Sequence, residues 1–188
     1  RPYIERKTKD NKIQRVPIGR SNQYVQRIFS RNSWKLNGRF YGGWWQQVGK
    51  SYRKDIMIDG SPTVEIDYKG MHVAILASEQ GVLMNDSYDW YTLDQIVVRG
   101  LDRASQRKAL KLLVLTAINA SSKEKAFKAY QSKRISSKDK RTGLYEFPKL
   151  NNAQLDLLLS CFIKKHPFLE EGICSDRGIE LMFMDSQI

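Results

Sequence analysis

The chain has 188 residues, of which 41% are hydrophobic and 28% are charged, and this balance excludes a disordered tail or a fibrous repeat. No apolar run approaches the roughly 20 residues of a membrane-spanning helix, and residues 1–20 show no apolar signal segment, so we expect a cytoplasmic protein without a membrane partner. Lysine and arginine number 32 against 20 acids, a net charge of +12, which favours a polyanionic partner.

The first part of the chain is predicted to hold an arm, a short helix and a strand. Residues 1–20 are basic and show no periodicity, so we expect an arm or linker. Asn22–Phe29 has apolar positions at helical spacing and predicts a short helix. Asn37-Gly38 is typical of a turn. The aromatic stretch Arg39–Trp45 predicts a strand.

The next segment predicts a strand that ends on an acid and leads into a helix. Asp59-Gly60 is typical of a hairpin turn. Thr63–Asp67 alternates apolar and polar residues and predicts a strand. Gly70 permits a tight exit, and the apolar residues that begin at Met71 predict a packed helix.

The second half of the chain is predicted to be mainly helical. Asp102 is expected to cap the longest helix. The expected elements, in chain order, are a short helix at Thr92–Val98, the long helix at Arg103–Ala120, a lysine-rich helix at Ser122–Ser132, an exposed flexible loop at Arg134–Arg141 and a helix at Asn152–Lys165. Together these elements predict an α+β fold.

The charge is arranged in blocks. Residues 1–54 hold 14 basic and 2 acidic side chains, and residues 103–149 hold 13 and 3. Between and after these blocks, residues 55–102 hold 2 basic and 9 acidic side chains, and residues 150–188 hold 3 and 6. A single basic run usually means a solvated surface. Two basic blocks around an acidic centre favour a polyanion held by its phosphates, with acids near a metal ion.

An acid after a predicted strand and a stripe of cations on the long helix combine into a candidate site. Asp67 ends a predicted strand, where its carboxylate and the carbonyl of Tyr68 could bind a divalent cation; the N-cap of the next helix is the more frequent role of an isolated acid. Arg103, Arg107 and Lys111 recur every four residues and share one stripe of the long helix. Such cations suit the phosphates of a nucleoside triphosphate, although a solvated helix face is the more frequent meaning.

Two segments resemble the motifs of a known family. Val64–Ala77, read VEIDYKGMHVAILA, resembles motif A of family A DNA polymerases and phage-type single-subunit RNA polymerases. Arg107–Lys111, continued to Asn119 and Ala120, resembles their motif B helix. Asn37–Tyr41 is similar to the Gly-Arg-aromatic segment upstream of motif A in the RNA polymerase branch.

This resemblance implies a fold and a set of roles. The fold would be a polymerase-like palm, a small antiparallel sheet with helices, plus helical fingers: palm at 21–100, fingers at 101–150 and a return helix at 151–188. Partners would be a DNA or RNA primer-template and nucleoside triphosphates, with Mg²⁺ or Mn²⁺ as cofactor. The implied roles are metal binding and catalysis for Asp67, nucleotide binding for Tyr68, His72, Arg107, Lys111 and Asn119, and nucleic-acid binding for Arg39 and Arg103.

The chain departs from the family pattern at several positions. His72 stands where DNA-synthesising members carry Glu and RNA-synthesising members carry Gly, so it leaves the sugar preference open. Leu115 and Asn119 replace the usual aromatic and tyrosine. Motif C is not evident: Asp185 follows an apolar run and is a candidate second metal ligand, but we interpret it as the N-cap of a further helix. On this interpretation the chain is a fragment that stops before motif C.

Two other functions remain open. One is a nucleic-acid-binding module without catalysis, or a degenerate polymerase. The other is a metal-dependent nuclease using Asp67, Glu65 and Asp185, although no general-base histidine is placed nearby. Among the aromatic residues, we expect two or three to be buried and at most one to face a base; these residues are Trp34, Phe40, Tyr41, Trp44 and Trp45.

Overall fold

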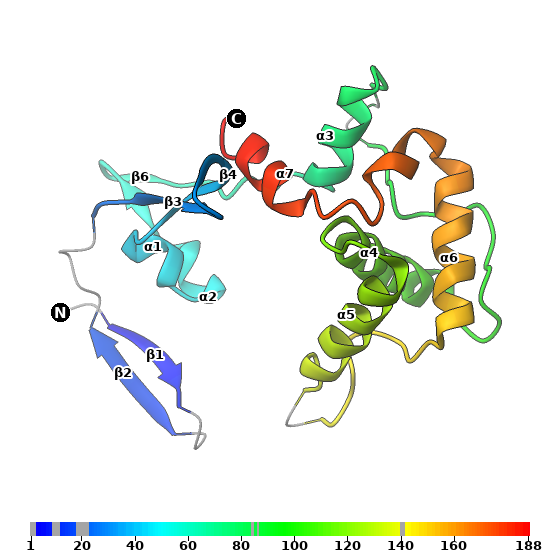
Figure 1. The fold of residues 1–188 in the computed structure, drawn as a ribbon. Coiled ribbons are helices and arrows are strands. Elements are labelled where there is room, and N and C mark those ends of the chain that lie inside the picture. The colour runs from blue at the N-terminus through cyan, green and yellow to red at the C-terminus, as the bar shows by residue number, and fades with distance from the viewer. Residues whose placement is uncertain (1–2, 9–11, 18–22, 84, 86, 140–141) are drawn as a thin grey trace. The chain divides into compact units, whose positions relative to one another are not determined.

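The computed structural model describes residues 3–8, 12–17, 23–83, 85, 87–139 and 142–188. The chain divides into two compact units, residues 1–68 and 69–188. Among the described residues, the first unit holds short antiparallel strand pairs and two single-turn helices, and the second unit holds the longer helices (Figure 1). The predicted α+β class is therefore confirmed. The segment boundaries at residues 20, 100 and 150 remain predictions.

The described strands of the first unit form three antiparallel pairs. Each strand pairs with its neighbour in sequence, as expected for short hairpins. The elements are β1 (Tyr3–Lys7), β2 (Ile13–Pro17), β3 (Gln26–Ser30), β4 (Ser33–Tyr41), α1 (Trp44–Gln47), α2 (Lys50–Arg53), β5 (Met57–Ile58) and β6 (Ser61–Pro62). The predicted hairpin turn at Asp59-Gly60 is confirmed, and both residues have the positive φ angles that such a turn requires.

The predicted helix at Asn22–Phe29 is wrong over its described residues, because residues 23–25 are irregular and residues 26–29 form most of β3; Asn22 lies outside the described part. Arg27 lies opposite Phe40, and Ile28 lies opposite Arg39 on β4. β-Branched and aromatic side chains favour such cross-strand pairing. The turn between the strands lies at Arg31-Asn32, both with positive φ. Asn37-Gly38 instead makes an irregularity inside β4, so the turn predicted there is also wrong.

The predicted strand at Thr63–Asp67 is also absent from the described structure. The amide of Thr63 donates a hydrogen bond to the carbonyl of Ile56, at 3.2 Å. Beyond that bond, the segment before Ile56 belongs to the turn after α2, and among the described residues no strand pairs with residues 63–67. Val64 and Ile66 are consequently 84% and 77% exposed. The alternating pattern predicted a strand, but a strand also needs a partner.

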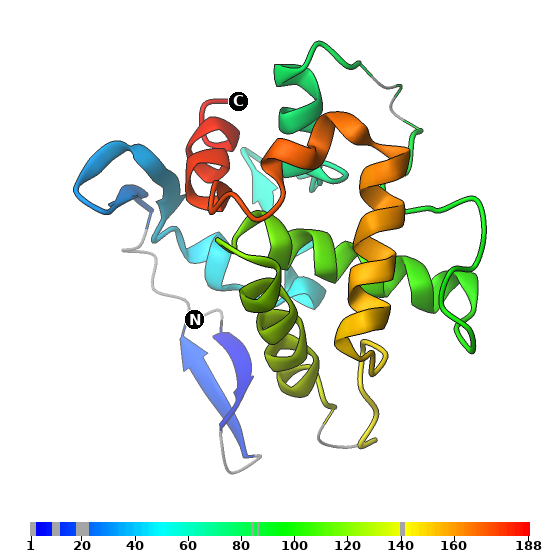
Figure 2. The ribbon, with the colours of Figure 1, turned by 45° about the vertical axis from the view of Figure 1, so that its right-hand side comes forward.

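The second unit is a helical assembly around α4. Its elements are α3 (Met71–Glu79), α4 (Arg103–Ile118), α5 (Lys123–Ser136), α6 (Asn152–Lys165), the 3₁₀ helix η1 (Pro167–Gly172) and α7 (Gly178–Asp185). Figure 2 shows α4, α5 and α6 side by side, and α3 packs against α7 and η1. Leu110, Leu113 and Ala117, predicted to face away from the cations of α4, are fully buried. Within the described residues, no helix combines the length and apolarity needed to cross a membrane.

Side-chain caps explain why the helix predictions in this unit are mostly right. The carboxylate of Asp102 accepts from the amide of Ser105, at 2.6 Å, and so caps α4 as predicted. Ser122 caps α5 in the same way, and Asn151 and Gln154 form a capping box at α6. α5 continues to Ser136 and shortens the predicted loop at 134–141, of which residues 140–141 lie outside the described part.

The buried histidine His166 holds the end of α6 against the loop that precedes α4. It is 1% exposed, and its Nε2 donates a hydrogen bond to the carbonyl of Trp90, at 3.2 Å. The rings of Tyr88, Trp90, Phe162 and Phe168 surround it, with centroids 5.0–5.9 Å away. Burial lowers the pKa of His166 from its ordinary 6.5, an effect that the hydrogen bond to Trp90 opposes.

This burial predicts a loss of stability in mild acid. The unfolded chain binds a proton at His166 as the pH falls below about 6.5, whereas the folded chain resists it, so the free energy of unfolding should fall between pH 7.5 and 5. Urea unfolding across this range measures the effect. His166→Gln should flatten the dependence; an unchanged slope in this variant would contradict the assignment.

Candidate functional site

Asp67 and Tyr68 close the first unit in irregular, exposed backbone. Asp67 does not cap the following helix, because Gly70 occupies the N-cap position of α3. The alternative interpretation of Asp67 as a structural cap is therefore wrong. Glu65, two residues before it, forms an ion pair with Arg53, with Oε1 and Nη2 3.2 Å apart. Asp67 thus presents its carboxylate to solvent next to an acid that pairs within its own unit.

Asp67 meets the chemical requirement for a divalent cation ligand in part. Carboxylate and main-chain carbonyl oxygens, such as those of Asp67 and Tyr68, are donors that Mg²⁺ prefers, and Mg²⁺ commonly completes its shell with water and substrate phosphates. In the described part of the chain, no three His, Cys, Asp or Glu side chains gather as a ready-made metal site. Further ligands would have to come from the substrate or from a second acid.

His72 lies in the first turn of α3 and is half-buried. The turn before it depends on Gly70, whose φ of +63° lies in the left-handed region. A Cβ at Gly70 would come within 2.9 Å of the ring of Trp90. The turn that leads into α3 therefore requires glycine at position 70, for its backbone conformation and for the space beside Trp90.

The predicted cations of α4 are exposed and lie along one side of the helix. Arg107, Lys111, Leu115 and Asn119 follow one another at intervals of four residues, and each is exposed. This spacing drifts by about 40° per step, so the four side chains form a slowly winding stripe. The stripe confirms the predicted placement of Arg107 and Lys111 on a common face.

Arg107 is paired with an acid that the sequence did not single out. Its Nε and Nη2 donate to the Oδ2 and Oδ1 of Asp89, at 2.5 and 3.1 Å. Partial burial would raise the pKa of Asp89, but hydrogen bonds from Arg107, Thr92 and the Tyr91 amide lower it to about 2. The pair therefore stays ionised at neutral pH and fixes the direction of the Arg107 side chain.

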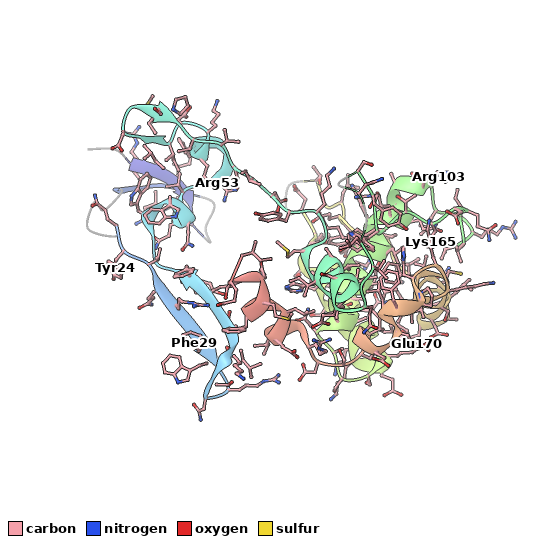
Figure 3. The ribbon with its side chains drawn as sticks, turned by 90° about the horizontal axis from the view of Figure 1, so that it is seen from above. Tyr24, Phe29, Arg53, Arg103, Lys165 and Glu170 are labelled. Carbon is pink, nitrogen blue, oxygen red and sulfur yellow. The ribbon has the colours of Figure 1, made fainter. Side chains whose placement is uncertain are left out.

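Arg103 and Lys165 hold the same loop from two helices. The Nη2 of Arg103 donates to the carbonyl of Asp94, at 3.3 Å, and the Nζ of Lys165 donates to its carboxylate, at 2.7 Å. Figure 3 shows Arg103 and Lys165 on one side of the second unit. Arg103 is thus occupied in part by loop positioning, a role that the sequence did not indicate.

Gln106 is the buried centre of this loop attachment. Its Oε1 accepts hydrogen bonds from the amides of Val97 and Val98, at 2.6 and 3.3 Å, and its Nε2 donates to the carbonyl of Gln95, at 3.0 Å. These bonds take the place of helical ones, which explains why the helix predicted at Thr92–Val98 is wrong. Gln106 itself carried no sequence signal, because its partners are backbone atoms.

Removing these bonds should destabilise the second unit. Gln106→Leu leaves two amides, one buried and one partly buried, without an acceptor and is expected to lower the free energy of unfolding by about 2 kcal/mol. Urea unfolding measures the loss, and hydrogen exchange at the Val97 and Val98 amides localises it. Gln131→Leu is the control, because Gln131 donates a single bond, to Leu150; equal losses in the two variants would contradict the role of Gln106.

Two pockets flank the stripe of α4. The smaller, about 250 Å³, is lined by Tyr91, Thr92, Leu93, Arg103, Ala104, Gln106 and Arg107. Burial, together with the charge of Asp89, raises the pKa of Tyr91 to about 12, so its hydroxyl stays protonated and can donate a hydrogen bond. This pocket joins two predicted cations to a phenol donor, which is a chemistry suited to anionic oxygen.

The larger pocket, about 850 Å³, lies at the other end of the stripe. Leu115, Asn119, Lys125, Lys133 and Asp176 are among its lining residues. The segment before α7 covers this end of α4, because the amide of Asp176 donates to the carbonyl of Ala120, at 3.0 Å. Asn119 packs directly on Gly178, where an added Cβ would lie 1.8 Å from its Oδ1. Asn119 therefore links the stripe to α7.

Asp185 is the last residue of α7, so its interpretation as the N-cap of a further helix is wrong. The apolar residues before it belong to α7, in which Leu181 is fully buried, and α7 packs against α3. The start of α7 is tied to α3 by Arg177, whose Nη1 and Nη2 donate to Glu79, at 2.9 and 2.8 Å. A metal-binding role for Asp185 remains a prediction.

The structure thus brings part of the predicted site together. Arg107 and Lys111 lie on α4, Asn119 is its C-cap, and His72 belongs to the same unit. Asp67, Tyr68 and Arg39 belong to the first unit. The chain matches no family model, no curated protein and no solved structure.

Proposed function

We propose that this chain is the palm and fingers part of a template-dependent nucleotidyltransferase of the family A type, acting in the cytoplasm on a DNA or RNA primer-template. One observation supports the proposal most: Arg107, Lys111, Leu115 and Asn119 lie on one exposed stripe of α4. A polymerase fingers helix must present its phosphate-binding cations and its base-facing residues in this way. The resemblance of Val64–Ala77 to motif A adds the catalytic acid.

Each residue then has a defined task. Asp67 and the carbonyl of Tyr68 would hold Mg²⁺ or Mn²⁺, which stabilises the attacking and leaving oxygens when bound. Lys111 would neutralise triphosphate oxygens as a point charge. Arg107 would use Nη1 for phosphate, since its Nε and Nη2 already bind Asp89. Asn119 would hydrogen-bond the sugar or base, and His72 would lie near the sugar.

The second candidate is a nucleic-acid-binding module without catalysis, or a degenerate polymerase. The pairing of Arg107 with Asp89 favours this alternative, because two of the guanidinium nitrogens are committed to an internal carboxylate. Both candidates predict an affinity for nucleic acid that falls steeply with salt. They differ in their dependence on a divalent cation and on Asp67.

A primer-extension assay separates the two candidates. Labelled primers on DNA and RNA templates are incubated with the chain, all four nucleotides of either sugar type, and Mg²⁺, Mn²⁺ or EDTA. Template-directed extension that EDTA abolishes supports nucleotidyl transfer. Binding of the primer-template at equal strength with metal and with EDTA, with no extension under any condition, would support the binding module and overturn the proposed activity.

A further inference from the structure

The β3–β4 hairpin carries a row of aromatic rings and one guanidinium on a single face. Arg27 and Phe40 are cross-strand partners, and Phe29 follows Arg27 on the same side of β3. The Cζ of Arg27 lies 5.3 Å from the ring centre of Phe29 and 5.2 Å from that of Phe40. Trp34 continues the row, with its ring centre 4.7 Å from that of Phe29. Figure 3 shows Phe29 on this hairpin.

This row is held in place but not covered. The Nε of Arg27 donates to the carbonyl of Gly38, at 2.7 Å, which fixes the guanidinium across the two strands. Trp34 is nevertheless 78% exposed and Phe40 47% exposed. The expectation that two or three of the five aromatics are buried is wrong, because none of them is buried. Exposed aromatic groups in a row are a feature of binding surfaces.

The positive charge around the aromatic row indicates a negatively charged partner. From residue 11 to residue 54 the sequence contains ten lysines and arginines and no aspartate or glutamate. Arg31, Lys35 and Arg39 lie in or beside the hairpin itself. The charged residues of the hairpin are all basic, and a basic surface is complementary to a polyanion.

We propose that the β3–β4 hairpin binds single-stranded nucleic acid, with bases stacked on Trp34 and Phe40 and with the neighbouring cations following the phosphates. Flat rings can meet the faces of bases only where the bases are unpaired, so a duplex offers the cations its phosphates but offers the rings nothing. Stacking on π-faces is tolerant of sequence. The site uses neither Asp67 nor a metal ion and therefore stands apart from nucleotidyl transfer.

The test is fluorescence anisotropy of the whole chain, in EDTA, with a labelled oligothymidylate of about 15 nucleotides and with a duplex of the same length. Trp34→Ala and Phe40→Ala should each weaken binding of the single strand about tenfold and leave duplex binding nearly unchanged. Trp34→Phe should keep most of the affinity. Tyr52→Ala is the matched control, because Tyr52 is an exposed aromatic of the same unit on α2; this variant should bind like the parent chain.

Several outcomes would overturn the proposal. One is unchanged single-strand binding in both Trp34→Ala and Phe40→Ala while circular dichroism matches the parent chain. Another is an equal loss for duplex and single strand, which would indicate charge alone. A third is loss of binding to phosphatidylserine vesicles without loss for the oligonucleotide, which would assign the row to a membrane surface. Asp67→Asn should bind the oligonucleotide normally, so failure of the proposed catalysis leaves this result intact.

Discussion

Asp67→Asn is expected to lower primer extension by at least about a hundredfold, because loss of a metal-binding carboxylate removes several kcal/mol of transition-state stabilisation. Asparagine keeps the size and one oxygen of the side chain but carries no negative charge. Asp67 is exposed and lies outside every helix and strand. The substitution should therefore leave the thermal unfolding midpoint unchanged, so the lost activity can be assigned to chemistry.

Asp55→Asn is the matched control for this experiment. Asp55 is an exposed acid of the same unit, twelve residues earlier in the sequence, and its replacement changes the net charge by the same amount. Extension rates are measured for both variants at several Mg²⁺ concentrations. Equal rates in Asp67→Asn and Asp55→Asn would show that the activity does not depend on Asp67, and the assignment of Asp67 as metal ligand would be abandoned.

Gly70→Ala is expected to lower the free energy of unfolding of the second unit by about 3 kcal/mol. About 1 kcal/mol of this comes from placing a side chain in the left-handed region, since Gly70 has a φ of +63°. The rest comes from the 2.9 Å approach of the new Cβ to Trp90, because overpacking a filled core commonly costs about 1–3 kcal/mol. Trp90 is 6% exposed and packs on His166, so moving its ring away would disrupt the packing of the core.

Gly81→Ala separates the two contributions. Gly81 follows α3 with a φ of +69°, but no atom lies within 4 Å of an added Cβ. Its replacement should therefore cost only the backbone part, about 1 kcal/mol. Urea unfolding of both variants gives the difference that is due to Trp90. If the two variants lost equal stability, the close packing of Trp90 on Gly70 would be refuted as the cause.

The helices of the second unit were predictable because their signals are local. Asp102 and Asn151 stand immediately before the helices that they cap, and the apolar spacing in α4 matches the residues that are buried. A helix closes its hydrogen bonds within one segment, so a window of sequence contains most of the information that it needs. The common stripe of Arg107 and Lys111 was predictable for the same reason.

The strands were not predictable in this way, because a strand is stabilised by hydrogen bonds to a second segment. The apolar spacing of the segment before and within β3 suits a helix as well as a strand; its apolar residues are Tyr24, Val25, Ile28 and Phe29. Pairing with β4 makes the second part of this segment a strand. Thr63–Asp67 shows the reverse case: its alternation suits a strand, yet no described strand pairs with it. The bonds that stabilise a strand belong to a second segment, which the pattern of the first does not specify.

The sequence alone established the α+β class, the main helices, the basic character of the surface and the positions of Asp67, Arg107 and Lys111 as candidate residues. The partners of these residues were settled by three-dimensional packing. The pairing of Arg107 with Asp89, the attachment of Val97 and Val98 to Gln106, and the contact of Asn119 with Gly178 join positions 8 to 59 residues apart. Contacts of this kind depend on how the folded elements pack against one another, and residue spacing along the chain does not specify that packing.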